Sequence, residues 1–367
     1  MTTRERPVGF LVVGAGFLGS QRAAAVAATS GARLIAVHDR DGATAERVAR
    51  RFGASAEPDF EEALARPGVD AVVVATPHAD HAAQASAALD AGKHLLVEKP
   101  LTIDPDDARM LALRADELRL RLATGLNHRF YPPVADALGL VDGGAIGRVE
   151  TVRAEIGHQA SPAFLAGWHA DVKRSGGGTL MDNGPHACDL IRRLLGEVVA
   201  TRGALRQSPE LQKGCETDAF AWFRDFDRGF AELRSSWAQP TGYLTLEIRG
   251  TEGWLRVETA PWALSGRTAN GRGLRRVYLA ERLAERAFRL RYRCEQSLVR
   301  EIEAFVAATR DQPRASLGAT GWDGCRVTEM IDAVYRADAL GTEVCLKPPL
   351  VHLPSRARRR ALTGRPA

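Results

Sequence analysis

The stretch VGFLVVGAGFLGSQRAAAVAA, residues 8–28, restricts the fold of this chain more than any other part of the sequence. A short apolar run leads into three closely spaced glycines and then into an alanine-rich run of good helix formers, an order that predicts a strand, a tight turn and a helix. The first glycine permits the turn, the second lets a pyrophosphate approach the backbone, and the third lets helix and strand pack closely. The pattern therefore predicts a dinucleotide-binding unit. The residues expected to contact the cofactor here are Gly14, Gly16, Phe17, Leu18 and Gly19.

A carboxylate follows this unit at a suitable distance. The apolar run ARLIAVHD ends at Asp39, a little more than the expected spacing of roughly 20 residues from the first glycine. An acid at this place accepts hydrogen bonds from the adenosine ribose hydroxyls and repels a 2′-phosphate, which favours NAD. The neighbouring Arg40 leaves NADP open, because an arginine here pairs with that phosphate.

The alternation of apolar runs and helix-forming stretches continues to residue 126. Repeated units of this kind predict a mostly parallel, doubly wound sheet that binds its ligand at the carboxyl ends of the strands. We therefore expect an NAD(P)-binding Rossmann domain over residues 1–126. The further residues expected at its cofactor site are Thr76, Pro77, Glu98 and Lys99.

The lysine at one of these strand ends is an unusual choice for packing. With the nicotinamide ring expected nearby, the ammonium of Lys99 is placed to reach a substrate hydroxyl and favour its alkoxide character. A surface lysine paired with Glu98 is the alternative. The bond before Pro100 is open to either the cis or the trans form.

Two histidines, His78 and His81, have an HxxH spacing that zinc sites also use. No third ligand is evident nearby in the sequence, and His81 falls in the first turn of the next predicted helix. We expect structural, hydrogen-bonded histidines and no metal.

The length and composition predict the number of domains and the cellular compartment. A chain of 367 residues exceeds the roughly 250 residues of a usual single core, which predicts two domains. The five cysteines include no CxxC pair, which predicts reduced thiols in the cytoplasm. The polar N-terminus and the glycines that interrupt the first apolar run predict neither a signal peptide nor a membrane association. Residues 351–367 predict a flexible basic tail; nucleic-acid binding by its arginines is the alternative that we do not expect.

The stretch GGGTLMDNGPHACDL, residues 176–190, places three glycines before a carboxylate and an imidazole. The glycines predict a loop that passes close to a bound ligand, and the proline predicts a helix start. Asp182 lies one turn before His186, and Asp189 shares a helix face with it. Because histidine titrates near neutral pH, we expect His186 to be the general acid and base. Asp182 is then its partner and a substrate hydrogen-bond acceptor, and Asp189 an orienting group.

From Arg148 the pattern changes to strand-like runs rich in Val, Thr, Phe and Trp, several with apolar residues at alternate positions. They predict an antiparallel sheet with one covered face. We expect a substrate and oligomerisation domain over residues 127–350, ending in helices near residues 295–310 and 320–340. The uncovered sheet face would associate with another copy, giving a homodimer or homotetramer.

Three further features of this part have weaker signals. Asn127 and Arg129 follow the last Rossmann strand, and Trp168 lies in the stretch AGWHADVK; Asn127 and Trp168 are candidates for substrate contact. The arginine-rich residues 266–293 predict an exposed segment with some helix. Contact with an acidic substrate group such as a phosphate is the alternative for that segment.

Together, the fingerprint at residues 14–19, the Glu98-Lys99-Pro100 segment and the stretch with Asp182 and His186 resemble the glucose-fructose oxidoreductase, inositol dehydrogenase and MocA (Gfo/Idh/MocA) family of oxidoreductases. The resemblance spans about residues 7–350. It implies an α/β Rossmann domain followed by an α+β domain with an open, mostly antiparallel sheet. It also implies that the lysine, aspartate and histidine surround the reacting carbon, and that Tyr243 lies near a substrate-contacting tyrosine of inositol dehydrogenase.

These features predict an NAD(P)-dependent oxidoreductase that transfers hydride between nicotinamide and a secondary alcohol or ketone of a sugar, cyclitol or related polyol. One alternative is a ketoreductase that acts on a nucleotide-linked sugar, favoured if the arginine-rich segment borders the site. Another is a catalytically idle NAD-binding sensor. The presence of Lys99, Asp182 and His186 counts against a sensor, because a sensor needs only the glycine fingerprint.

Overall fold

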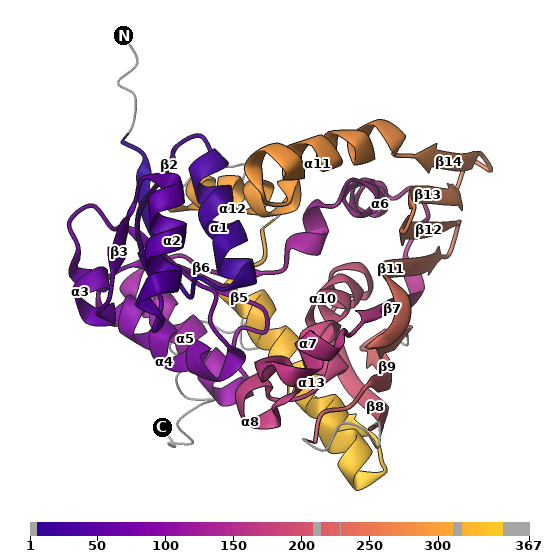
Figure 1. Cartoon of the computed structure of the whole chain (residues 1–367). Helices are drawn as coiled ribbons and strands as arrows, with labels where there is room; N and C mark the ends of the chain where they lie inside the picture. Colours follow the sequence, from indigo (N-terminus) through magenta and orange to yellow (C-terminus); the bar gives the residue numbers. More distant parts are fainter. Residues whose placement is uncertain (1–5, 208–213, 228, 311–317, 348–367) are drawn as a thin grey trace.

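The computed structural model describes residues 6–207, 214–227, 229–310 and 318–347, and it consists of two sheets with helices packed around and between them (Figure 1). The basic tail predicted for residues 351–367 lies outside the described residues.

The first sheet is entirely parallel, with the strand order β3-β2-β1-β4-β5-β6. This is the doubly wound order of dinucleotide-binding folds, so the predicted Rossmann fold is confirmed. Its strands are β1 (Val8–Val13), β2 (Ala32–His38), β3 (Ser55–Glu57), β4 (Ala71–Val74), β5 (His94–Glu98) and β6 (Leu122–Gly125). Its helices are α1 (Phe17–Ala28), α2 (Gly42–Phe52), α3 (Phe60–Ala65), α4 (His78–Asp90) and α5 (Pro105–Leu118).

The second sheet has nine strands in the order β14-β13-β12-β11-β7-β10-β9-β8-β15. Its neighbouring strands are antiparallel apart from the parallel pair of β7 and β10, which confirms the predicted mostly antiparallel sheet. Its strands are β7 (Val149–Gln159), β8 (Val198–Arg206), β9 (Asp218–Asp225), β10 (Phe230–Ser236), β11 (Ala238–Gly250), β12 (Trp254–Thr259), β13 (Trp262–Arg267), β14 (Gly273–Val277) and β15 (Val344–Cys345).

The segments between and after these strands form the remaining helices. They are η1 (Asn127–Phe130), α6 (Pro132–Asp142), α7 (Pro162–Ala166), η2 (Trp168–Ala170), α8 (Val172–Ser175), α9 (Thr179–Asp182), α10 (Gly184–Leu195), α11 (Leu279–Tyr292), α12 (Gln296–Thr309) and α13 (Gly321–Leu340). The two predicted C-terminal helices are present as α12 and α13. The arginine-rich stretch is not only helical, because it also holds the end of β13 and all of β14 before α11 begins.

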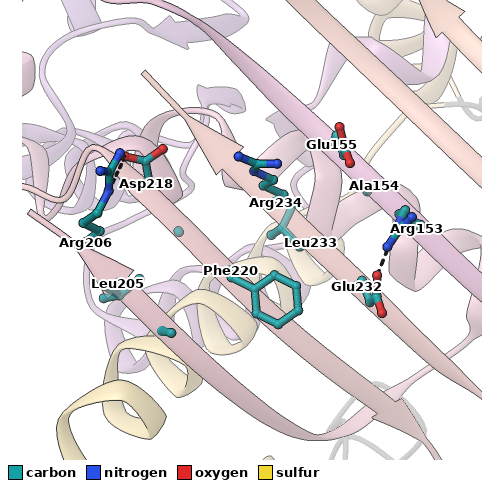
Figure 2. Close-up of a pocket in the computed structure, with 12 residues that line it drawn as sticks. Arg153, Ala154, Glu155, Leu205, Arg206, Asp218, Phe220, Glu232, Leu233 and Arg234 are labelled. Carbon is teal, nitrogen blue, oxygen red and sulfur yellow. Dashed lines mark hydrogen bonds and ion pairs between the residues drawn. The ribbon is translucent and has the colours of Figure 1, made fainter. Parts of the chain in front are cut away.

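One face of the second sheet is covered by helices, and the other carries charged side chains. Alternate residues of β7 and β11, such as Ile156 and Leu246, are buried in a core that also contains side chains of α10 and α13. The residues between them point to the opposite face, which carries ion pairs such as Arg153 with Glu232 at 2.9 Å around a hollow of ≈ 640 Å³ (Figure 2). The predicted sheet with one covered face is therefore present.

The C-terminal helices join the two parts of the molecule. α12 packs against the first sheet, where the ring of Phe305 lies 5.9 Å from that of Phe10. α13 contributes Cys325 to a core of the first sheet and Met330 to the core of the second. Helices α12 and α13 thus connect the cores of the two sheets.

Among the residues that the structure describes, no helix is both long enough and apolar enough to cross a bilayer. The same residues contain no group of three or more His, Cys, Asp or Glu side chains arranged to hold a metal ion.

Candidate active site

The glycines of the first turn serve three different purposes. Gly14 has a φ of +87°, and a Cβ there would lie 2.7 Å from the carbonyl of Ala75. A Cβ on Gly19 would lie 1.8 Å from the Gly14 oxygen, so the helix packs on the turn only because this residue is glycine. A Cβ on Gly16 would meet nothing within 4 Å. The second glycine therefore faces open space, as a pyrophosphate site requires.

The start of α1 is suited to bind an anion. Its N-cap residue, Gly16, has no side chain to accept a hydrogen bond, and its first turn has no acidic residue. The backbone N–H groups and the positive end of the helix dipole are thus available for a phosphate. Phe17 is 87% exposed beside them, and Leu18 is partly buried.

Asp39 lies directly after β2 and is tied to the glycine turn. Its Oδ2 accepts a hydrogen bond of 2.6 Å from the backbone N–H of Ala15, and its Oδ1 accepts one from the N–H of Asp41. This places the carboxylate beside the turn, where the adenosine ribose is bound in this type of fold. Arg40 is exposed next to it.

The end of β5 places two adjacent charged residues on different sides. Glu98 is buried and accepts a hydrogen bond from the Nε of Arg22, which comes from α1. We expected Glu98 to face the cofactor, but the structure shows that it points into the protein. The Nη1 of Arg22 donates to Glu301 of α12 at 2.6 Å, so one guanidinium serves two buried carboxylates. A Cβ on Gly125 would lie 2.7 Å from Arg22, which explains the glycine there.

Lys99 points the other way, toward the second sheet. Its peptide bond to Pro100 is cis. Its Nζ donates hydrogen bonds to the backbone oxygen of Asp182 at 2.7 Å and to the Oδ1 of the same residue at 2.8 Å. The alternative of a surface lysine paired with Glu98 is therefore wrong.

Asp182 is a charged carboxylate held from two sides. Its Oδ2 accepts a hydrogen bond of 3.1 Å from the Nε1 of Trp237. Burial alone raises the pKa of Asp182, but the charge and hydrogen bond of Lys99 outweigh burial and, with His158 and His78, hold that pKa well below its usual range. Asp182 is therefore ionised at neutral pH.

His186 lies in the first turn of α10 and stacks on another imidazole. Its ring centroid is 3.8 Å from that of His128, and the two planes differ by 8°. Its Nδ1 is buried without a hydrogen-bond partner among the described residues, and Asp182, which we expected to be its partner, pairs with Lys99 and Trp237 instead. Burial, followed by the charges of His128 and Lys99, holds the pKa of His186 well below its ordinary value, so the ring is neutral at neutral pH.

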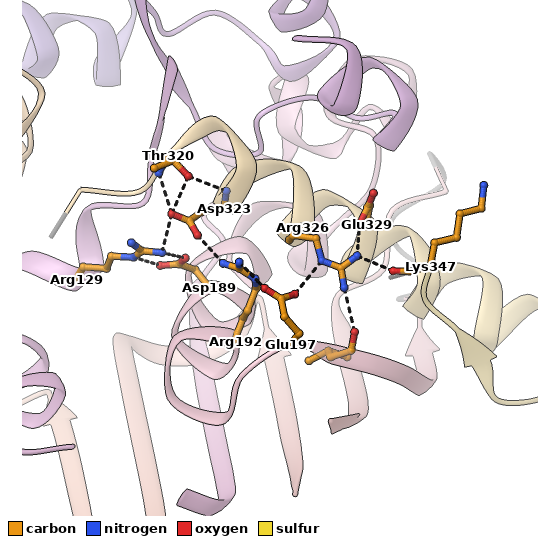
Figure 3. Close-up of polar contacts among 10 residues, drawn as sticks. Arg129, Asp189, Arg192, Glu197, Thr320, Asp323, Arg326, Glu329 and Lys347 are labelled. Carbon is orange, nitrogen blue, oxygen red and sulfur yellow. Dashed lines mark hydrogen bonds and ion pairs between the residues drawn. The ribbon is translucent and has the colours of Figure 1, made fainter. Parts of the chain in front are cut away.

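Asp189 was expected to orient His186, but it binds Arg129. Its two oxygens accept hydrogen bonds from the Nε of Arg129 at 2.7 Å and from the Nη2 of the same side chain (Figure 3). Asp323 of α13 extends this group and also binds Arg192, as the figure shows. The pair of Arg129 and Asp189 links η1 to α10, the two elements that carry the stacked histidines.

The three proposed substrate residues have different surroundings. The amide of Asn127 is buried and donates to Ser297 of α12 at 2.9 Å. Trp168 stacks on His169 at 3.9 Å and meets His78 edge-on at 4.8 Å. On β11, the side chain of Tyr243 points away from the core that contains its neighbour Leu244. The charges of Glu155 and Arg234 affect the pKa of Tyr243. The structure thus places Tyr243 on the outer face of the sheet, away from Lys99, because the side-chain period of a strand is two.

The remaining strand-end residues make structural contacts. Thr76 donates from Oγ1 to Gln84 at 2.6 Å, and Pro77 precedes the first turn of α4. The Nδ1 of His78 lies 2.7 Å from the oxygen of Ser175, and the ring nitrogens of His81 lie 2.9 Å and 3.0 Å from two carbonyl oxygens. Both histidines are hydrogen-bonded, as predicted.

The glycine run before Asp182 is required by contacts within the protein. A Cβ on Gly177 would lie 2.0 Å from the hydroxyl of Tyr335, and one on Gly178 would lie 1.9 Å from the backbone oxygen of Glu216. The carboxylate of Glu216 accepts hydrogen bonds from the N–H groups of Gly178 and Leu180, both at 2.8 Å. We expected close approach of a ligand here, but the close approach is to Tyr335 and Glu216, which fix the loop before Asp182.

Four residues of the site were missed by the sequence analysis. His128 had a signal, since it directly follows Asn127 after the last Rossmann strand. The others, Trp237, Arg22 and Glu301, come from distant parts of the chain and carry no local motif.

A glycine turn suited to a pyrophosphate, with a lysine, a carboxylate and a neutral imidazole near the same strand ends, defines an NAD-dependent oxidoreductase. Residues 8–126 match the model of the oxidoreductase family with an NAD-binding Rossmann fold, and residues 134–256 match the GFO/IDH/MocA C-terminal domain. The chain belongs to the Gfo/Idh/MocA family of oxidoreductases, and its cofactor is NAD.

Individual relatives agree with this assignment. The chain is 30% identical over 339 residues to inositol 2-dehydrogenase of Rhizobium meliloti (strain 1021), covering 90% of this chain and 97% of the relative. It is 30% identical over 262 residues to scyllo-inositol 2-dehydrogenase (NAD(+)) of Bacillus subtilis (strain 168), covering 70% and 75% of the two chains. The crystal structure of GenD2 from gentamicin A biosynthesis, in complex with NAD, is similar with a TM-score of 0.76 and 31% identity over 95% of this chain and 98% of that chain.

Proposed function

We propose that the protein oxidises a secondary hydroxyl of a cyclitol or sugar, or reduces the matching ketone, with Lys99, Asp182 and His186 as its catalytic residues. The observation that carries this proposal is the contact between Lys99 and Asp182, which joins the end of β5 in the cofactor-binding sheet to α9, the short helix directly before the one that carries His186. The names of the inositol dehydrogenases among its relatives support the substrate class.

The residues that would hold NAD fit the cofactor. The open space at Gly16, the uncapped start of α1 and the carboxylate of Asp39 suit a pyrophosphate and a ribose. When bound, NAD supplies the hydride chemistry. The protein supplies the position of the substrate and the route of its proton.

The proton leaves the hydroxyl through the protein's own groups. The ammonium of Lys99 donates a hydrogen bond to the substrate oxygen and stabilises its alkoxide character, while Asp182 holds that ammonium in place. The neutral imidazole of His186 takes the proton as the hydride departs, and returns it in the reverse reaction.

A substrate screen tests this function. Cyclitols, free sugars and nucleotide-linked sugars are each offered with NAD and NADP, and NADH or NADPH absorbance is followed. We expect NAD-dependent turnover of a cyclitol or free sugar, and its loss in His186→Ala with NAD affinity retained. Turnover of nucleotide-linked sugars alone would instead select the ketoreductase. NAD binding with no turnover of any substrate would select the sensor.

The assembly and location are a second part of the proposal. The uncovered face of the second sheet carries exposed aromatic residues, including Phe220 (47% exposed) and Phe230 (41%), which support association of this face with another copy. We infer a homodimer or homotetramer in the cytoplasm, with residues 1–126 as the NAD-binding unit and residues 127–350 as the substrate and oligomerisation unit. Light scattering after size-exclusion chromatography gives the mass, and Phe220→Glu should lower it.

A further inference from the structure

The ring of His186 lacks the anchor that a buried histidine usually has. A buried imidazole normally hydrogen-bonds through one nitrogen to a carbonyl or carboxylate, and that bond fixes its orientation. The Nδ1 of His186 has no such partner among the described residues. The two nearby acids of the same region, Asp182 and Asp189, are bound to Lys99 and Arg129. Another contact must therefore set the plane of the ring.

That contact is the face of His128. The two imidazoles are almost parallel at 3.8 Å, and the Nδ1 of His128 is also buried without a partner among the described residues. The ring of Tyr131 stacks on His128 at 4.6 Å. The hydroxyl of Tyr131 donates to Glu295 at 3.2 Å, so the ring that supports His128 is itself held in place.

The two stacked histidines come from η1 and α10, which are joined by a buried ion pair. His128 and Arg129 are neighbours on η1, and His186 and Asp189 lie three residues apart on α10. The hydrogen bonds between Arg129 and Asp189 fix the distance between η1 and α10, because both side chains are buried. A movement of η1 away from α10, which would separate the two rings, would have to break this pair.

We propose that His128 is a positioning residue for His186, and that the face of its ring sets the plane in which the catalytic imidazole meets the substrate. The proposal rests on the proposed role of His186 as the general acid and base. The nitrogens of His128 take no part in the chemistry. The property of His128 that His186 requires is a flat aromatic face. The charged and titratable groups that act on His186 are His128, Lys99 and Arg22.

Two variants separate the face of the ring from its nitrogens. His128→Phe keeps a flat ring without nitrogens, and His128→Ala removes the face. We expect His128→Ala to lower kcat by about 10- to 100-fold with the KM for NAD unchanged, since a small misplacement of a catalytic group costs about that much. His128→Phe should restore most of the lost activity. If His128→Ala does not fold, His128→Leu replaces it, because leucine fills the space without a flat face.

The ring protons of His186 report the stack without any substrate. In the NAD-bound protein, their NMR signals should lie upfield because of the neighbouring ring, move downfield in His128→Ala and stay upfield in His128→Phe. Unchanged signals and full activity in His128→Ala would overturn the proposal. A His128→Phe variant as impaired as His128→Ala would also overturn it, since the nitrogens would then be needed. A wild-type protein without turnover contradicts the proposed function instead, and the NMR signals still decide whether the stack exists.

Discussion

The Nζ of Lys99 lies 2.8 Å from the Oδ1 of Asp182, and this contact joins the end of strand β5 in the first sheet to the turn before α10 beside the second sheet. Both side chains are largely buried, with exposed fractions of 15% and 14%. The ammonium also lies close enough to His186 for its charge to lower the pKa of that imidazole. The candidate active site therefore takes residues from both parts of the chain.

Replacement of Lys99 by methionine should lower kcat by a factor of about 10² to 10⁴, because the substrate oxygen loses its cationic partner. NAD binding should persist, since the glycine turn and Asp39 are untouched. Steady-state kinetics and NAD titration measure the two effects. Lys93→Met is the matched control: Lys93 donates to the oxygen of Val69, away from the site, and its loss should leave kcat unchanged.

Glu301 should make stability depend on pH. Burial, with the like charge of Glu98 and against the attraction of Arg22, raises the pKa of Glu301 from 4.5 to about 7. A raised pKa in the folded state stabilises the protein below the unfolded pKa, and this stabilisation is lost as the pH rises through the folded value. Between these two pH values the wild type should lose up to about 1.4 kcal/mol per pH unit relative to Glu301→Gln.

Thermal unfolding of both proteins across that pH window measures this difference. Glu303→Gln is the control, because Glu303 is exposed on the same helix and should show no such trend. A wild type and Glu301→Gln variant with parallel pH curves would show that the carboxyl of Glu301 does not titrate there.

The pair of Arg129 and Asp189 should be sensitive to the loss of one partner. Arg129→Met leaves a buried carboxylate without its main cation, which costs about 3 to 5 kcal/mol. The double variant Arg129→Met/Asp189→Leu should cost less than the single one, because no buried charge is left unpaired. Denaturant unfolding gives both values.

Arg193→Met is the matched control for that pair. Arg193 lies on α10, as Asp189 does, and binds Asp142 at 2.6 Å. Both side chains of this pair are substantially exposed, so replacing Arg193 should lower the free energy of unfolding by less than about 1 kcal/mol. An equal cost for the two arginines would mean that burial does not determine the strength of the pair.

Asp39 should determine the preference for NAD. Asp39→Asn keeps an oxygen for the N–H of Ala15 and removes the charge that repels a 2′-phosphate. The ratio of kcat/KM for NADP to that for NAD should rise about 10- to 100-fold, which corresponds to the 1 to 3 kcal/mol of a near-surface charge interaction. Addition of Arg40→Ala should remove part of this gain. An unchanged ratio would mean that another residue selects the cofactor.

Much of the Rossmann part could be predicted from the sequence, because its signals are local. The glycines of residues 14–19 and the regular alternation of strands and helices depend on neighbours in the chain. The short strand β3 and helix α3 were missed, since three and six residues give too little periodicity to recognise. In the second part, strands β8, β13, β14 and β15 were not predicted, and β14 lies within the arginine-rich residues 266–293.

The expectations that the structure contradicts concern which side chains contact one another. Asp182 was expected to pair with His186, and in the structure it binds Lys99 instead. Tyr243 was expected at the substrate, while the strand alternation places it on the outer face. Such pairings depend on the register of distant strands and on the packing of helices, which no spacing in the sequence encodes.

The sequence by itself determined that the chain binds a dinucleotide, that a lysine follows a parallel strand, and that a carboxylate precedes a helix whose first turn carries an imidazole. Each of these features follows from residues close together in the chain. The tertiary structure decided which of them touch. Helix α12 packs on a core of the first sheet and α13 on cores of both sheets. The contacts of Asp182 with Lys99, of His128 with His186 and of Glu301 with Arg22 join segments that are far apart in the chain, so no local pattern of residues specifies them.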